Sequence, residues 1–407
     1  MQCRPVAQPP RPILFTAFEP SGDDLASSVI AALKDRSPGA SLFAWGGPKM
    51  EAAGATIVER TGEDAVVGAP GLSKILAHVR MNRRIARWMD EHRPALHVAV
   101  DSPAANFPIC AAAKRRGIRV AHLAAPQLWA WAPWRIRKLR RRTDRVLCLL
   151  PFEEEWFRAR GVPATFIGHP VFDRAPANAD QSPQEGAGNE ASVQDEQRRP
   201  LRLAVMPGSR QAELRRHMPL ILEILRAVRR DRPGLEIRFA VQDDAAQARV
   251  QELASRTGGL PAGAEIIAGP SAVAQAAPWA DAALTKSGTV TLRLARARCP
   301  MVVLYRTLTW GYLLIGRWLL TNPHRAMPNL IAGRRIVEEF VPHVGGARPI
   351  IAALERLLDD PALRVRERHD LDEVAHLFEG RDAADTAATQ ILSLYTSSED
   401  HNGPGGT

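Results

Sequence analysis

The chain has 407 residues, of which 45% are hydrophobic and 24% charged, so it is long enough for two hydrophobic cores. The longest apolar stretch, Leu308–Leu320, contains Arg317 and is shorter than the roughly 20 residues of a membrane-spanning helix. No apolar signal segment precedes Pro12, and the four cysteines form no Cys-x-x-Cys pair. We therefore expect a cytoplasmic protein without a disulfide framework.

The net charge of +10 indicates an anionic partner, which could be nucleic acid, a membrane surface or a phosphorylated substrate. Basic residues cluster at Arg80–Arg87 and Arg135–Arg142, beside apolar or Trp residues. Such clusters suit an anionic phospholipid surface. Nucleic-acid binding rests on charge alone, because no known module is present, and we do not expect it.

The first half of the chain alternates strand-like and helix-like segments, which is typical of a parallel, doubly wound α/β sheet. The predicted strands are Pro12–Thr16, Ser41–Trp45, Ala95–Val100, Ile118–Leu123, Arg145–Leu150 and Thr165–Ile167, with a helix at Asp24–Lys34. The same pattern restarts at Leu201–Met206. It continues with a helix at Gln211–Arg229 and strands at Glu236–Val241, Ala264–Ala268, Ala282–Leu284 and Met301–Tyr305. We expect two Rossmann-like domains with a cleft between them.

The change of composition along the chain suggests domain boundaries. We predict a flexible tail at 1–11, an N-terminal domain at 12–174, a flexible linker or disordered loop at 175–200, a C-terminal domain at 201–365, C-terminal helices at 366–396 and a disordered tail at 397–407.

The segment Met206–Glu213 lies between a predicted strand and a long predicted helix. Gly208 lets the backbone approach a ligand closely, and a helix N-terminus offers free N–H groups. Arg210 adds a planar cation suited to a diphosphate. The alternative is an ordinary tight turn in which Ser209 caps the helix.

A second loop of this kind, Lys286–Thr291 with the sequence Lys-Ser-Gly-Thr-Val-Thr, follows the strand at Asp281–Leu284 and opens another helix. Together the two loops could hold a nucleotide diphosphate, although Ser-Gly-Thr before a helix is often only a cap. The Gly-x-Gly-x-x-Gly and P-loop fingerprints are missing, which argues against dinucleotide and P-loop sites.

Asp101 follows a predicted strand directly, where a carboxylate could take a proton from a sugar hydroxyl. The alternative is that Asp101 caps the next helix. Glu19–Asp23 follows the first strand and either lines the cleft or forms a turn. The histidines and carboxylates form no metal-ligand pattern, so we expect neither a metal nor another cofactor.

Several segments in a fixed order resemble the lipid A disaccharide synthase family, whose members are metal-independent inverting glycosyltransferases of the two-domain GT-B fold. The matching segments are Glu19–Asp23, Gly46–Met50, Val100–Pro103 with Asn106, Pro126–Trp131, Leu150–Glu153, Ile167–Pro170, Pro207–Glu213, Ser287–Thr289, Cys299–Val303 and Met327–Arg334.

The resemblance implies transfer of 2,3-diacylglucosamine from UDP to the 6-hydroxyl of 2,3-diacylglucosamine 1-phosphate, forming a β-1,6 disaccharide. It implies that Asp101 is the general base. The acceptor side would include Glu19, Ser21, Asp23 and Asn106. The UDP side would include Gly208, Ser209, Arg210, Glu213, Ser287, Gly288, Thr289, Asn329 and Glu339.

Both substrates would be acylated, so the resemblance also implies contact with the inner face of the cytoplasmic membrane. Val66–Trp88 and Leu308–Leu320 are the candidate docking segments, although both could equally be buried helices. A homodimer is compatible with the family.

Several positions depart from the family, among them Phe18, Gly71 and Ala104. The most serious departure is Arg293, which stands where members carry a Glu that accepts from the ribose hydroxyls. A guanidinium only donates hydrogen bonds. Two alternatives therefore stay open: a UDP-sugar 2-epimerase, which shares the architecture, and a non-catalytic relative that binds lipid or nucleotide.

Overall fold

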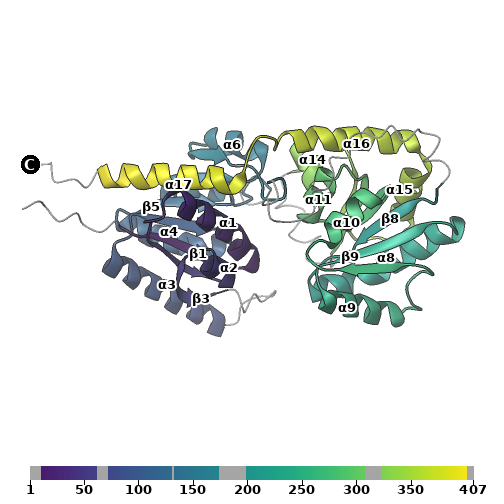
Figure 1. Ribbon diagram of the computed structural model, residues 1–407, viewed down its shortest axis with the longest axis horizontal. Helices are drawn as coiled ribbons and strands as arrows, with labels where there is room; N and C mark the ends of the chain where they lie inside the picture. Colours follow the sequence, from purple (N-terminus) through teal and green to yellow (C-terminus); the bar gives the residue numbers. More distant parts are fainter. Residues whose placement is uncertain (1–10, 62–71, 131–132, 174–198, 308–321, 401–407) are drawn as a thin grey trace, which may run out of the picture. The chain divides into compact units, whose positions relative to one another are not determined.

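The computed structural model of the protein describes residues 11–61, 72–130, 133–173, 199–307 and 322–400 (Figure 1). Contacts divide the chain into two compact units, one of residues 1–173 with 380–407 and one of residues 174–379. Among the described residues, no helix is both long enough and apolar enough to cross a membrane.

The first unit is built on a parallel seven-stranded sheet in the order β3-β2-β1-β4-β5-β6-β7. The strands are β1 (Ile13–Ala17), β2 (Leu42–Gly46), β3 (Thr56–Arg60), β4 (Leu96–Val100), β5 (Arg119–Leu123), β6 (Arg145–Cys148) and β7 (Ala164–Phe166). The central strands β1 and β4 are wholly buried, which is why they read as continuous apolar runs. The edge strand β3 was not predicted, because its residues are only partly buried or exposed.

Helices cover both faces of this sheet. They are α1 (Pro20–Arg36), α2 (Pro48–Ala52), α3 (Leu72–His92), α4 (Pro103–Arg115), the short 3₁₀ helix η1 (Pro133–Arg135), α5 (Ile136–Arg142), α6 (Pro151–Arg158) and α17 (Ala383–Asp400). Helix α4 contacts both α3 and α5. Helix α17 packs on α1 and β5 (Figure 1).

The last helix, α17, completes the core of the first unit. Its residues Ala387 and Ile391 are buried in the same cluster as Phe15 and Leu33. The Tyr395 hydroxyl donates to the carbonyl of Arg11 over 3.0 Å. Apolar burial of this kind contributes about 25 cal/mol per Å², so the return of the chain to the first unit stabilises that unit directly.

The second unit has a parallel six-stranded sheet in the order β10-β9-β8-β11-β12-β13. The strands are β8 (Arg202–Met206), β9 (Glu236–Val241), β10 (Glu265–Ala268), β11 (Ala282–Lys286), β12 (Met301–Arg306) and β13 (Glu338–His343). Strand β13 was not predicted, since its sequence EEFVPH lacks a buried apolar run.

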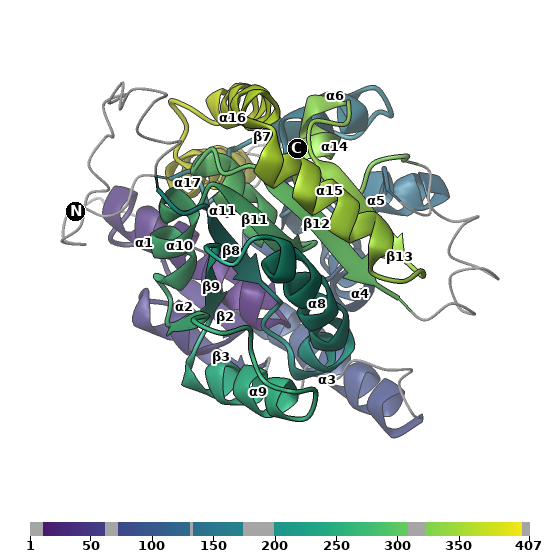
Figure 2. The ribbon, with the colours of Figure 1, turned by 90° about the vertical axis from the view of Figure 1, so that its right-hand side faces the viewer.

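The helices of the second unit are α8 (Gln211–Asp231), α9 (Asp244–Ser255), α10 (Ala272–Trp279), α11 (Val290–Arg296), α14 (Met327–Ala332), α15 (Arg348–Asp359) and α16 (Pro361–His376). Helices α8 and α15 lie side by side over the sheet (Figure 2). Leucines and isoleucines of both helices share one buried cluster with β8, β9 and β12.

The two Rossmann-like α/β units confirm the predicted fold class. The segment 366–396 was predicted as one set of C-terminal helices, but α16 belongs to the second unit and α17 to the first. The tail predicted from residue 397 is wrong at its start, because α17 continues to Asp400. The predicted linker at 175–200, the tail at 1–11 and the candidate docking segment Leu308–Leu320 lie almost wholly outside the described residues.

Candidate functional site

Asp101 lies at the carboxyl end of β4, in a strained turn. Its φ is 46° and that of Ser102 is 38°, in the left-handed region that non-glycine residues seldom adopt. The N-cap residue of α4 is Ser102 and not Asp101, so Asp101 is not the cap of this helix. Asp101 itself is half-buried.

Buried Asn106 holds this turn in place. Its amide nitrogen donates to the carbonyls of Val100 and Asp101, each over 2.9 Å. Its amide oxygen accepts from the Thr16 hydroxyl over 2.6 Å. Asn106 was expected on the acceptor side, but it is fully buried and positions the Asp101 backbone from below.

The surroundings of Asp101 favour a proton acceptor. Burial raises the pKa of the Asp101 carboxyl, the Ser102 backbone N–H opposes this, and the nearby charge of Glu19 raises the pKa further. Glu19 in turn accepts from the Ser102 hydroxyl over 2.8 Å. The structure therefore brings Glu19, from the loop after β1, beside the Asp101 turn that follows β4.

Two buried histidines under this loop were missed by the sequence analysis. Nε2 of His97 lies 2.8 Å from the Thr16 hydroxyl oxygen, and Nδ1 of His122 lies 3.1 Å from the carbonyl oxygen of Ala124. Burial lowers the pKa of His97 to about 3 and that of His122 to about 4. A single His inside an apolar strand, as in ALHVAV, was the available signal.

Of the two remaining acceptor-side candidates, Ser21 is exposed and Asp23 is buried. Ser21 is exposed in the first turn of α1. Asp23 is buried, and its carboxylate accepts from the backbone N–H groups of Gly47, Lys49 and Met50, each over 3.1 Å. Asp23 therefore caps α2, and the expectation that it faces an acceptor is not supported by its contacts.

In the second unit, two glycine loops follow the paired parallel strands β8 and β11, so both lie at the carboxyl edge of the sheet. Gly208 has a φ of 115° and Gly288 a φ of 154°, which side chains with a Cβ rarely adopt. The N-cap residue of α8 is Arg210, which excludes the alternative that Ser209 caps it. Ser209 and Thr289 are exposed and Ser287 is half-buried at this edge.

Glu213 and Lys286 form an ion pair behind the two loops. Nζ of Lys286 lies 3.0 Å from Oε1 of Glu213, and Nη1 of Arg210 lies 3.5 Å from the same oxygen. The Arg210 side chain is 65% exposed, whereas the Lys286 side chain is 16% exposed. Lys286 was not among the predicted site residues, although it directly precedes Ser287.

Asn329 and Glu339, two residues predicted on the UDP side, form hydrogen bonds to backbone atoms of their own unit. The Asn329 side chain is fully buried, accepts from the backbone N–H groups of Ile336 and Val337 and donates to the Val337 carbonyl. Its amide therefore joins α14 to β13 and offers no exposed atom to a ligand in this arrangement. Glu339 accepts from the backbone N–H groups of Arg325 and Ala326 over 3.0 and 2.5 Å, and so holds the start of α14.

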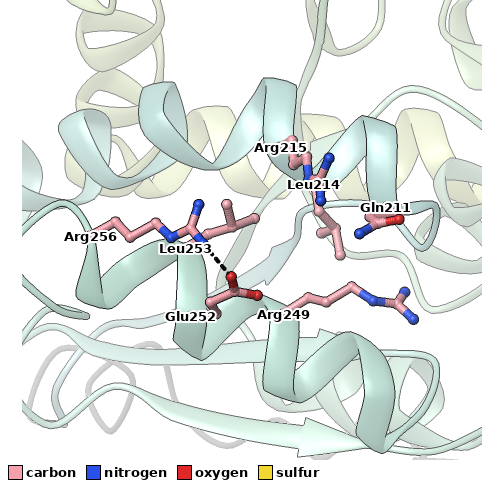
Figure 3. Close-up of a pocket in the computed structure, with 7 residues that line it drawn as sticks. All are labelled: Gln211, Leu214, Arg215, Arg249, Glu252, Leu253 and Arg256. Atoms are coloured by element: carbon pink, nitrogen blue, oxygen red, sulfur yellow. Dashed lines mark hydrogen bonds and ion pairs between the residues drawn. The ribbon is translucent and has the colours of Figure 1, made fainter.

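A pocket between α8 and α9 can be separated from this site. It is lined by Gln211, Leu214, Arg215, Arg249, Glu252, Leu253 and Arg256 (Figure 3). Its volume of about 10 Å³ is close to that of one water molecule. A nucleotide does not fit there, and Arg256 is paired with Glu252. Within the described residues, no three His, Cys, Asp or Glu side chains are grouped as metal ligands.

Comparison with known proteins identifies the family. The family model described as lipid-A-disaccharide synthetase matches residues 13–391. The lipid-A-disaccharide synthase of Geobacter metallireducens is 31% identical over 390 residues, covering 95% of this chain and 98% of the relative. That of Pseudomonas aeruginosa is 32% identical over 384 residues, covering 94% and 97%.

Solved structures confirm the GT-B fold. The UDP complex of S. aureus MnaA has a TM-score of 0.59 at 12% identity, covering 96% of this chain and 97% of that one. Acinetobacter baumannii MurG has a TM-score of 0.55 at 14% identity, covering 95% and 100%. At such identities the likeness concerns the fold alone, whereas the sequence relatives share their whole length with this chain. The chain therefore belongs to the lipid-A-disaccharide synthetase family and is a glycosyltransferase of lipid A biosynthesis.

Proposed function

We propose that the protein transfers 2,3-diacylglucosamine from UDP to the 6-hydroxyl of 2,3-diacylglucosamine 1-phosphate. The bond from the sugar C1 to the UDP oxygen breaks, and a β-1,6 bond to the acceptor oxygen forms. The acceptor proton leaves to a base, and UDP leaves as the anion. Attack on the face of C1 opposite to UDP would invert the configuration at C1.

The observation that carries the proposal is the geometry of Asp101. A carboxylate on a strained turn, held by buried Asn106 and raised in pKa by burial, is suited to accept the hydroxyl proton as the new bond forms. Glu19 accepts a hydrogen bond from Ser102 of this turn, and exposed Ser21 lies in the first turn of α1, the helix after β1. We assign both residues to acceptor binding.

We assign the donor diphosphate to the second unit. The loops at Gly208 and Gly288 allow close backbone approach, and exposed Arg210 can form paired charge-assisted hydrogen bonds to phosphate oxygens. Positive charge and N–H donors would stabilise the UDP leaving group, as a divalent metal does in other transferases. The proposed mechanism therefore uses no metal ion.

We also propose peripheral attachment to an anionic membrane surface through α3 and α5. Leu76 and Val79 of α3 are 55% and 41% exposed, and Trp134, just before α5, is 64% exposed. The basic clusters Arg80–Arg87 and Arg135–Arg142 continue along the same two helices. Binding to vesicles containing phosphatidylglycerol should weaken as the salt concentration rises. An affinity that does not change with salt concentration would contradict the electrostatic part of this proposal.

The reaction is tested by UDP release from UDP-2,3-diacylglucosamine with the acceptor in detergent micelles. Asp101→Asn keeps the shape of the side chain and should lower kcat by about 10²–10⁴-fold. Asp90→Asn is the matched control, because Asp90 is an exposed carboxylate of the same unit that pairs with Arg116. Equal turnover by the wild type and Asp101→Asn would remove Asp101 from the role of base.

The pH dependence gives a second check on Asp101. Since burial raises the pKa of its carboxyl above the ordinary 3.8, kcat/KM should fall on acidification with a midpoint above 3.8. The acidic limb should disappear from the residual activity of Asp101→Asn. An unchanged limb in that variant would assign it to another group.

A further inference from the structure

The strongest feature outside the assigned residues is the side chain of Lys286, which runs between the two glycine loops. A Cβ built on Gly208 would lie 3.7 Å from Cδ of Lys286, and one built on Gly288 would lie 3.3 Å from its Nζ. The ammonium group also lies 5.8 Å from the centre of the Tyr305 ring. The stem therefore follows one loop, and the charge lies beside the other.

Glu213 holds the ammonium group in this place. Glu213 is 9% exposed, and its Oε1 is the atom 3.0 Å from Nζ. Its second oxygen, Oε2, is buried and has no hydrogen-bond partner in the described part of the chain. A Cβ on Gly208 would come within 3.1 Å of that oxygen, so the carboxylate lies directly under the first loop.

His217, which lies near Glu213 and Lys286, does not add a second cation beside Lys286. His217, one turn after Glu213 on α8, is buried and packs edge-on against Tyr305 with ring centres 5.1 Å apart. Burial, foremost, lowers the pKa of His217, and the positive charge of Lys286 lowers it as well, against the charge of Glu213. His217 is therefore neutral near pH 7.

From this geometry we infer that Lys286 is a diphosphate-contacting residue of the donor site and that Glu213 is its positioning residue. The inference rests on the proposed function, because it names a further contact of the same donor. Arg210 is mostly exposed and reaches the ligand from solvent, whereas Lys286 supplies a largely buried cation between the loops. A buried cation is screened less by salt and water than an exposed one.

The inference changes the expected role of Glu213. A carboxylate in direct contact with a diphosphate would repel it, but a carboxylate behind Lys286 fixes where the ammonium group lies. Substitution of Glu213 should therefore act through Lys286 and affect the phosphates rather than the nucleoside.

The test measures equilibrium binding of UDP, uridine and inorganic pyrophosphate by calorimetry. Lys286→Met should weaken UDP and pyrophosphate binding about tenfold or more, because a charge-assisted contact is lost, while uridine binding changes less than about twofold. Lys286→Arg should retain part of the affinity for UDP. Glu213→Gln should weaken UDP about threefold to tenfold with uridine unchanged, which a merely structural defect would not do.

Two variants guard the interpretation. Lys286→Met leaves Glu213 buried without its partner and can unfold locally, so the double variant Lys286→Met with Glu213→Gln removes both charges together. Arg215→Met is the control, since it deletes one cation from the exposed side of α8 facing α9 (Figure 3). Its UDP affinity should stay within twofold of the wild type.

The outcomes separate the two proposals. UDP binding that is equal in the wild type, Lys286→Met and the double variant overturns the inference and leaves the transferase intact. A wild type that binds pyrophosphate through Lys286 but not UDP supports the diphosphate site and overturns the proposed donor. A wild type that binds neither overturns both.

Discussion

The Asp101 loop of the first unit and the two glycine loops of the second unit turn the chain through positive φ in different ways. After β4, the chain turns through positive φ at Asp101 and Ser102, which are not glycines. After β8 and β11, it turns at Gly208 and Gly288, which adopt positive φ without strain. The Asp101 loop is held by the buried amide of Asn106, whereas the two glycine loops adopt these angles without such support. The comparison teaches that here two non-glycine residues adopt positive φ where a buried side chain holds their backbone.

The largest loss of stability at neutral pH should follow from removing the support of the Asp101 loop. Asn106→Ala deletes the donor to the carbonyls of Val100 and Asp101 and leaves the Thr16 hydroxyl without its acceptor. We expect a loss of about 2–3 kcal/mol in the free energy of unfolding and a fall in kcat of about 100-fold. Urea unfolding and UDP release measure the two effects. Full activity in Asn106→Ala would mean that the turn supports itself.

A smaller loss of stability should follow from adding a side chain to the Gly208 loop. Gly208→Ala places a Cβ 3.1 Å from Oε2 of Glu213 at a φ of 115°. We expect it to lower the free energy of unfolding by about 1–2 kcal/mol and to weaken UDP binding, while acceptor KM is unchanged. Gly39→Ala is the matched control, because a Cβ there meets no heavy atom within 4 Å. A tolerated Gly208→Ala would break the contrast between the Asp101 loop and the glycine loops.

The polar layer under the Asp101 loop should make stability depend on pH. Folding lowers the pKa of His97 from 6.5 to about 3. As pH falls, His97 is therefore protonated in the unfolded chain at a higher pH than in the folded protein. The stabilisation from neutral His97 is full above pH 6.5 and is lost on acidification towards the folded pKa, by about 1.4 kcal/mol per pH unit.

Between pH 4 and 6, unfolding of the wild type should take up about one proton at His97, and His97→Gln should abolish that uptake. The free energy of unfolding of the variant should therefore depend less steeply on pH, as measured by urea unfolding at several pH values. His122 will contribute a similar slope of its own, because its pKa is lowered to about 4. His376 on α16 is exposed, and His376→Gln is therefore the control that should leave most of the slope in place. A slope equal in the wild type and His97→Gln would contradict a neutral, buried His97.

The smallest effect separates a cap from a ligand contact. Asp23→Asn should cost about 1 kcal/mol of stability, since the amide accepts from the start of α2 less well than a carboxylate. Acceptor KM should not change. Glu19→Gln is the comparison, because Glu19 lies at the Asp101 turn and should raise acceptor KM. An increase in KM for Asp23→Asn would restore Asp23 to the acceptor side.

The sequence predicted the parts of the molecule that local pattern encodes. Buried strands such as Leu96–Val100 read as apolar runs, and the glycine loops read as turns between a strand and a helix. The edge strands Thr56–Arg60 and Glu338–His343 were missed, because pairing along one edge does not require an apolar run.

The roles of Asp23 and Asn329 could not be read locally either. Both sit in motifs of the family, yet their polar groups contact backbone atoms of Gly47 and Val337, brought close by the fold. Lys286 opens a predicted loop but was not assigned to the site for a related reason: its significance comes from its distance to Glu213, which lies on another element. Residue type and spacing thus predicted candidate site residues, and tertiary contacts gave Asp23 and Asn329 structural partners.

The assignment of α17 to the first unit has a consequence for biosynthesis. The second unit is inserted into the first, so the ribosome makes residues 174–379 before the helix that completes the first core. Until α17 emerges, the apolar faces of α1 and β5 that it covers have no native partner. The first unit, which holds Asp101, therefore reaches its final packing last, although its strands are synthesised first.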